Sequence, residues 1–305
     1  MAIVRTDVPM TAKLCDDTIL ALSEQYPFLR SELLTVSAYD RPIRTLVIGT
    51  GQRRVLYSGA HHANEWITAS VLLKFMEDLA QAVQEGGTIG QTDAGELVRE
   101  VTVYCVPMVD PDGVDLVTGG IRPGQLQYEA AREVADRFPQ IPFPEGWKAN
   151  LLGVDLNLNY PAGWLQAREI KFSQGFTRPA PRDYVGRSPL DQLETRALAG
   201  YTEFVDPALV LAYHSQGKEI YWQFGDIFVP GARELGQRLA QVSGYTLAET
   251  PFNSSFAGYK DWFIQNFRRP GYTVEVGEGE NPLPISQFDE IYRDNLPLLL
   301  TAARG

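Results

Sequence analysis

Two histidines and a glutamate have the residue types and the spacing of a catalytic metal site. His62 follows a short apolar run, and Glu65 comes three residues later, at the start of an amphipathic stretch. At the first turn of a helix, side chains three residues apart lie on one face, so an imidazole nitrogen and a carboxylate can converge on one ion. His214 ends a second apolar run and can supply a third ligand. Two imidazoles and one carboxylate are a zinc ligand set that keeps one position open for water.

The histidines also have a structural explanation. A histidine at the end of a strand is often a hydrogen-bonded structural residue, so the spacing alone leaves both roles open for His62 and His214. For His61 the structural role is expected, because consecutive strand or turn residues point in different directions.

Hydrolysis at such a metal also needs a carboxylate that is not itself a ligand. Glu275 lies in the apolar run Tyr272–Val276, where a buried charge needs a function or a partner. A general base is one explanation, and a structural ion pair is the other. Glu278 and Glu280 follow in a glycine-rich turn and are expected to be solvated.

Apolar strands alternate with amphipathic helices along the whole chain. Strands are predicted at 33–38, 44–48, 54–57, 101–108, 208–214, 219–224 and 272–276, and helices at 12–26, 64–83, 188–204, 231–242, 257–267 and 285–303. Asp110–Gly113 predicts a turn, and residues 119–146 predict a long excursion without a sheet pattern. The alternation predicts an α/β fold: a single domain, residues 1–305, with a mixed, mainly parallel twisted sheet and helices on both faces. The histidines fall at the carboxyl ends of strands, where such sheets place their active sites.

Composition excludes several classes of partner. The chain has 305 residues, of which 44% are hydrophobic and 21% charged, and its formal net charge is -11. A chain this acidic is not expected to bind nucleic acid or an anionic membrane surface, because both need a basic face. The apolar stretches are too short or too broken to predict a membrane span. Residues 1–17 carry charges throughout, so a cytoplasmic location is expected, or an exported one if a signal peptide has been removed. Of the two cysteines, Cys105 is expected to be a small buried hydrophobic residue.

Five short motifs in order resemble those of the zinc carboxypeptidase family of metallopeptidases. The segment Gly59–Trp66 resembles the first metal motif of the family, and Val109–Gly113 resembles its Asn-Pro-Asp-Gly turn, with Asp in place of Asn. Gly153–Pro161 is similar to its substrate-binding motif, and the third ligand and the catalytic glutamate correspond to His214 and Glu275. The resemblance extends from about Leu14 to Ala303 and implies a zinc carboxypeptidase-like fold.

The resemblance implies roles for the candidate residues. One zinc ion would be held by His62, Glu65 and His214, and would activate water and polarise the scissile carbonyl. Glu275 would take the proton of the water and deliver it to the leaving amine. The family stabilises the oxyanion with an arginine, and Lys148 occupies the similar place here. A surface role is the alternative for Lys148, and Arg122 is then the second candidate for the cation.

Three departures from the family pattern bear on the substrate. Typical members have Asn-Arg-Asn in the substrate motif, where the Asn-Arg pair binds the free terminal carboxylate of a peptide. Here Leu158 replaces the arginine, although Asn157 can still hydrogen-bond substrate. The substrate-capping tyrosine of the family falls at Asn253. Lys260 falls at the residue that sets side-chain preference, where a cation suits an acidic group.

Trp147–Asn150 and Gly153–Trp164 most resemble a bacterial branch, the γ-D-glutamyl-L-diamino acid endopeptidases. These enzymes cut peptidoglycan stem peptides between D-glutamate and the diamino acid, meso-diaminopimelate in many walls. The resemblance therefore implies a zinc peptidase that acts on a muropeptide or related peptide. Two alternatives stay open: an ordinary metallocarboxypeptidase, which Leu158 and Asn253 disfavour, and a non-catalytic peptide-binding protein on the same fold. Glu275 disfavours the second alternative, because binding alone needs no buried general base.

Overall fold

The structure is a computed structural model that describes residues 2–305, so Met1, the first residue of the predicted domain, lies outside it. A mixed sheet organises these residues. Its eight strands within residues 2–305, in spatial order, are β1 (Arg30–Val36), β2 (Pro42–Ile48), β6 (Val101–Val106), β3 (Arg53–Ser58), β7 (Leu209–His214), β10 (Gly271–Glu275), β8 (Glu219–Tyr221) and β9 (Thr246–Ala248). The four central strands β6, β3, β7 and β10 run parallel to one another, whereas β2 and β8 run antiparallel to their central neighbours. A separate hairpin joins β4 (Thr88–Ile89) to β5 (Thr92–Asp93).

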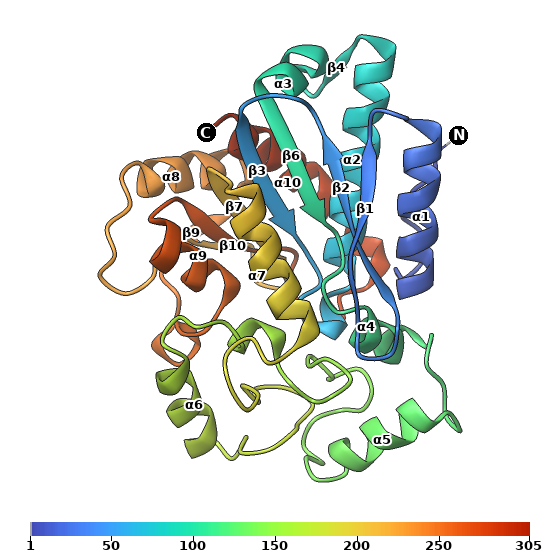
Figure 1. Ribbon diagram of the computed structural model, residues 1–305, viewed down its shortest axis with the longest axis vertical. Coiled ribbons are helices and arrows are strands. Elements are labelled where there is room, and N and C mark those ends of the chain that lie inside the picture. The colour runs from blue at the N-terminus through green and yellow to red at the C-terminus, as the bar shows by residue number, and fades with distance from the viewer. Residues whose placement is uncertain (1) are drawn as a thin grey trace.

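Helices cover both faces of this sheet. The α-helices within residues 2–305 are α1 (Ala12–Gln25), α2 (Ile67–Glu85), α3 (Ala94–Glu100), α4 (Pro111–Thr118), α5 (Leu126–Ala135), α6 (Trp164–Ser173), α7 (Leu193–Val205), α8 (Ala232–Ser243), α9 (Tyr259–Phe267) and α10 (Phe288–Arg304). Side chains alternate across a strand, so Val55 and Tyr57 pack in one core with α1, α2, α8 and α10, while Leu56 packs in the other with α7 and α9. Figure 1 shows α7 in front of the sheet and α2 and α10 behind it. The predicted α/β fold is thus confirmed.

The predicted turn at Asp110–Gly113 is wrong, because these residues begin α4. The Asp110 carboxylate accepts a hydrogen bond from the Gly113 backbone N–H at 3.0 Å, and Pro111 occupies the first turn. Asp followed by proline suits the start of a helix as well as a turn. The Asp side chain caps a free N–H group of the first turn, and proline at the first helical position has no N–H group to leave unpaired.

Several other local predictions differ from the structure. The helix predicted from residue 64 begins with a short 3₁₀ turn, Ala63–Glu65, before α2, and the helix predicted at 188–204 begins only at Leu193. The sequence pattern missed the short strands β4, β5 and β9 and the helices α5 and α6. These elements are short or weakly amphipathic, so their hydrophobic period is faint.

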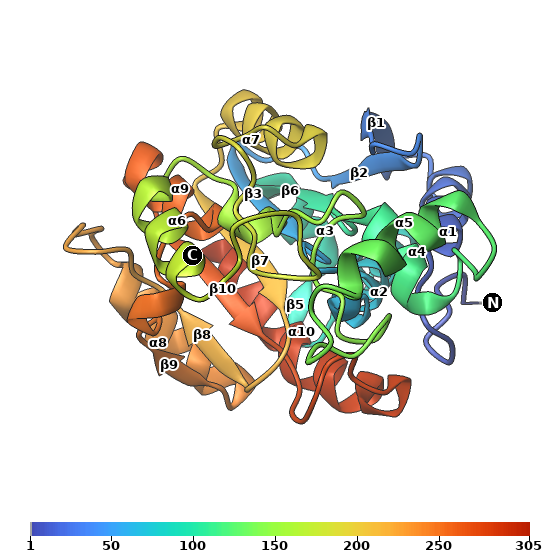
Figure 2. The ribbon, with the colours of Figure 1, turned by 90° about the horizontal axis from the view of Figure 1, so that it is seen from below.

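The long connection between β6 and α7 covers the carboxyl edge of the central strands. It lies beneath the arrowheads of β3 and β6 in Figure 1 and nearest the viewer in Figure 2. Its residues 180–184 run beside residues 148–155, because the backbone N–H groups of Lys148 and Ala149 both donate to the Pro181 carbonyl, at 2.8 and 2.9 Å. The connection therefore forms one wall over the place where the predicted site residues end their strands.

Among the helices of residues 2–305, none combines the length and the apolar character needed to cross a bilayer.

Candidate metal centre and active site

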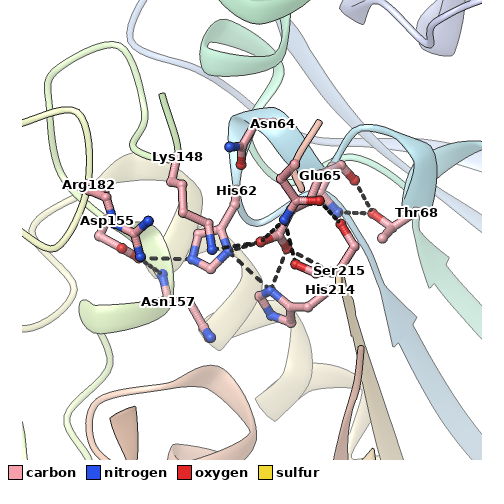
Figure 3. A network of polar contacts seen from close by, with 12 residues as sticks. His62, Asn64, Glu65, Thr68, Lys148, Asp155, Asn157, Arg182, His214 and Ser215 are labelled. Carbon is pink, nitrogen blue, oxygen red and sulfur yellow. Dashed lines mark hydrogen bonds and ion pairs between the residues drawn. The ribbon is translucent and has the colours of Figure 1, made fainter. Parts of the chain in front are cut away.

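The predicted site residues meet at the carboxyl ends of three adjacent strands. His62 and Glu65 follow β3, His214 is the last residue of β7, and Glu275 is the last residue of β10. In the register of β7 with β10, His214 lies directly opposite Glu275. Figure 3 shows His62, Glu65 and His214 turned toward one another. Local chain direction and strand pairing thus bring together residues that are up to 213 positions apart.

The donor atoms of three of these residues converge. Nδ1 of His62 lies 2.9 Å from one carboxylate oxygen of Glu65, and Nδ1 of His214 lies 2.9 Å from the other. The two Nδ1 atoms are 3.2 Å apart, and all three side chains are buried. One candidate ligand atom from each residue lies within 4.8 Å of those of the other two. Two imidazole nitrogens and a carboxylate are the donor types that zinc prefers, so this set fits a zinc ion.

Asp155 orients the His62 ring from the opposite side. Its carboxylate lies 3.1 Å from Nε2 of His62 and also accepts the backbone N–H groups of Asn157 and Asp183. Burial alone would raise the pKa of Asp155, but its contacts with His62 outweigh burial, and the pKa lies below the usual value. The carboxylate is therefore ionised and only accepts hydrogen bonds. Nε2 of His62 must therefore carry the hydrogen, and in the neutral ring Nδ1 is left bare toward Glu65 and His214.

Charges around the site shift the pKa of its titratable groups. Burial lowers the pKa of His62, but Glu65 and then Asp155 more than compensate and raise it to about 9. Burial first, and then the negative charge of Glu65, raise the pKa of Glu275 to about 8. A carboxyl group with a pKa in this range is a strong base when ionised, as a general base requires.

Two pockets open at the site, an inner pocket and an outer pocket. The inner pocket is lined by His62, His214, Asn157, Leu158 and Lys260, among others, and the outer pocket by Asn64, Ser215, Glu280 and Asn281, among others. Lys148, Arg182 and Glu275 line both pockets. The two pockets therefore form one cleft that passes the candidate metal centre.

The predicted cations and substrate residues lie in or beside this cleft, with the following partners. Nζ of Lys148 is 2.9 Å from a carboxylate oxygen of Glu65. Lys260 is buried, and its Nζ donates to the Gln223 carbonyl at 2.6 Å and contacts the Asp261 carboxylate at 2.5 Å. The Asn157 side-chain oxygen accepts the backbone N–H of Tyr259 at 3.0 Å. The roles of Lys148, Asn157 and Lys260 stay predictions, although the charge of Lys260 is already matched by Asp261.

Other residues singled out in the sequence lie outside the cluster of ligands. His61 is fully buried, its ring stacks on His214 with centroids 5.5 Å apart, and burial lowers its pKa well below the usual value. Arg122 is exposed and donates to the Gly119 carbonyl, and it lines neither pocket of the described chain. Asn253 lies in an exposed 3₁₀ turn whose neighbours Pro251 and Ser254 line the inner pocket.

Sequence reasoning missed two residues of the site. Asp155 belongs to a motif that was assigned to substrate, so its contact with His62 was not expected. Arg182 lies in an irregular segment with no periodic pattern, and Figure 3 places it beside Asp155. No local signal identifies it, because hydrogen bonds to a distant segment, such as those that Pro181 and Asp183 make with residues 148–155, bring it to the cleft.

Comparison with known proteins agrees with this geometry. The sequence profile of the zinc carboxypeptidase family matches residues 16–298. The chain is 42% identical over 282 residues to gamma-D-glutamyl-L-diamino acid endopeptidase 1 of Lysinibacillus sphaericus. The matched residues make up 92% of this chain and 69% of that protein. It is 33% identical over 297 residues to the uncharacterized protein YqgT of Bacillus subtilis (strain 168), covering 95% of this chain and 77% of YqgT.

The solved structure of carboxypeptidase A from Helicoverpa armigera has the same fold. It superposes with a TM-score of 0.76 over 98% of this chain and 74% of that chain, at 19% sequence identity. Because the family profile covers most of the chain and a 42%-identical relative spans nearly all of it, the chain belongs to the zinc carboxypeptidase family of metallopeptidases.

Proposed function

We propose that residues 1–305 form a single zinc peptidase domain that hydrolyses the γ-D-glutamyl-diamino acid bond of peptidoglycan stem peptides. The observation that carries this proposal is the convergence of His62, Glu65 and His214 beside Glu275, in a cleft lined by Leu158. In the sequence motif, Leu158 stands in place of the carboxylate-binding arginine of ordinary carboxypeptidases. The 42% identity to a gamma-D-glutamyl-L-diamino acid endopeptidase supports this choice of substrate.

His62, Glu65 and His214 would hold one zinc ion through the two Nδ1 atoms and the carboxylate. When bound, the ion supplies Lewis acidity for the scissile carbonyl and for the attacking water. Asp155 keeps the His62 ring turned so that Nδ1 faces the site.

Other residues of the cleft would transfer the proton of the attacking water, stabilise the negative charge of the reacting carbonyl and bind the substrate. Glu275 accepts a proton from the attacking water and returns it to the leaving amine, so it acts first as base and then as acid. Lys148 lies where the two pockets meet and would stabilise the negative charge that develops on the carbonyl oxygen. Asn157, whose side chain lines the inner pocket, would hydrogen-bond the substrate, and Lys260 would set the charge of the inner pocket together with Asp261.

Mass-spectrometric digestion tests the proposal. We expect the enzyme to release the diamino acid from L-Ala-γ-D-Glu-meso-diaminopimelate, to leave an ordinary peptide with a free C-terminus intact, and to lose activity in a chelator. Metal analysis is expected to give one zinc ion per chain, and a His214→Ala variant should lose it. Trimming of the ordinary peptide with no cleavage of the tripeptide would contradict the substrate assignment.

A further inference from the structure

Arg182 lies where the inner and outer pockets meet. Only three residues of the described chain, Lys148, Arg182 and Glu275, line both pockets. Because Glu275 is the proposed base, the scissile bond has to lie near this junction. A charged group of the substrate next to that bond would therefore come within reach of Arg182.

The position of Arg182 is set by its own backbone and by an ion-pair triad. The backbone N–H groups of Lys148 and Ala149 hold Pro181, the residue before it. Nε of Arg182 donates to one oxygen of Asp183 at 2.6 Å, and Nζ of Lys171 donates to the other at 2.5 Å. One carboxylate thus faces two cations, so this triad keeps a net positive charge beside the cleft.

The hydrogen-bonding capacity of Arg182 is not used up. Within residues 2–305, its terminal nitrogens Nη1 and Nη2 have no hydrogen-bond partner, and the side chain is 44% exposed. The other cations of the cleft differ: Lys148 contacts Glu65, Lys171 contacts Asp183, and Lys260 contacts Asp261. Of these cations, Arg182 alone offers a planar pair of donors, the geometry that matches a carboxylate.

We propose that Arg182, braced by Asp183 and Lys171, binds a substrate carboxylate next to the scissile bond. It would supply the anion recognition that Leu158 cannot provide. This inference rests on the proposed function, and a γ-D-glutamyl-diamino acid substrate offers two candidate groups: the free α-carboxylate of D-glutamate and the carboxylate at the L-centre of the diamino acid, whose nitrogen belongs to the scissile bond.

The test measures kcat/KM of three enzymes, the parent, Arg182→Gln and Arg182→Lys, on each of three tripeptides. All three enzymes are loaded with zinc. The first tripeptide is L-Ala-γ-D-Glu-meso-diaminopimelate, the second has the glutamyl α-carboxylate as an amide, and the third has the carboxylate at the L-centre of the diamino acid as an amide. We expect the parent to prefer the first over one of the amides by roughly 10- to 100-fold in kcat/KM, because a charge-assisted bidentate contact is lost. The amide that is disfavoured identifies the carboxylate.

Arg182→Gln should lose this preference, with kcat/KM for the first tripeptide falling by roughly 10- to 100-fold and that for the disfavoured amide changing little. Arg182→Lys should recover part of the loss. Arg178→Gln is the matched control, since Arg178 is exposed on the same connection and lines neither pocket, and it should behave as the parent. An equal fall on all three tripeptides would instead make Arg182 a structural residue and overturn the inference.

Calorimetric binding separates this inference from the proposed function. If the parent cleaves none of the tripeptides, the proposed function fails, and the dissociation constants then decide the role of Arg182. Tighter binding of the first tripeptide than of one amide, abolished in Arg182→Gln, would support carboxylate recognition. Equal dissociation constants for parent and variant would refute it.

Discussion

Replacing Asp155 by Asn tests how the candidate metal centre is built. In the structure, the ionised Asp155 accepts the hydrogen of Nε2 of His62 at 3.1 Å, so Nδ1 is the ring nitrogen that can give up its proton to bind a metal. An Asn side chain of nearly the same shape can instead donate its amide hydrogen to Nε2. The neutral ring would then carry its hydrogen on Nδ1, the atom that faces Glu65 and His214.

The size of the effect follows from the contact that is lost. A buried hydrogen bond to a charged group contributes about 1.5–3 kcal/mol, which corresponds to a change of roughly 10- to 150-fold in an equilibrium constant. Loss of a residue that orients a metal-bound histidine lowers metal affinity by about 10- to 100-fold in other proteins. We therefore expect Asp155→Asn to raise the zinc dissociation constant by roughly 10- to 100-fold.

Competition with a chromophoric chelator measures this constant directly. Asp136→Asn serves as control, because Asp136 is exposed at the end of α5 and lines neither pocket, and it should bind zinc as the parent does. Thermal melting of the metal-free proteins checks that the variants fold. A folded Asp155→Asn variant with the zinc affinity of the parent would refute the orienting role of Asp155.

Two further predictions concern carboxyl groups whose pKa is raised. Glu275→Gln should keep its zinc but lose roughly 10²- to 10⁴-fold in kcat, because the amide cannot accept the proton of water; steady-state rates and metal analysis check this, and a variant as active as the parent would remove Glu275 from the mechanism. Burial raises the pKa of Glu194, in the first turn of α7, from the usual 4.5 to about 7. Between pH 4.5 and 7, Glu194 therefore keeps its proton in the folded protein but has lost it in the unfolded chain. The stability that this group contributes is present below pH 4.5 and is lost as the pH rises toward 7. Relative to Glu194→Gln, the free energy of unfolding of the parent should fall by roughly 3 kcal/mol between pH 4.5 and 7. Urea unfolding at several pH values measures it, with the exposed Glu234→Gln in the first turn of α8 as control, and a difference that does not vary with pH would contradict the reasoning.

The sequence by itself determined the features that depend on local geometry. The period of apolar residues predicted the central strands and most of the long helices, because a strand and a helix repeat their buried positions differently. The pairing of His62 with Glu65 is local too, because a spacing of three residues within one helical turn brings the two side chains together. Glu275 was recognisable because a charge within an apolar strand is unusual.

Tertiary structure decided the features that join segments distant in the chain. Asp155 contacts His62 across 93 positions, and Arg182 comes to the cleft through hydrogen bonds to the backbone of Lys148 and Ala149. Nζ of Lys260 donates a hydrogen bond to the carbonyl of Gln223, 37 positions earlier in the chain. Irregular segments carry no repeating pattern, so their paths depend on the hydrogen bonds and packing that they find in the folded protein.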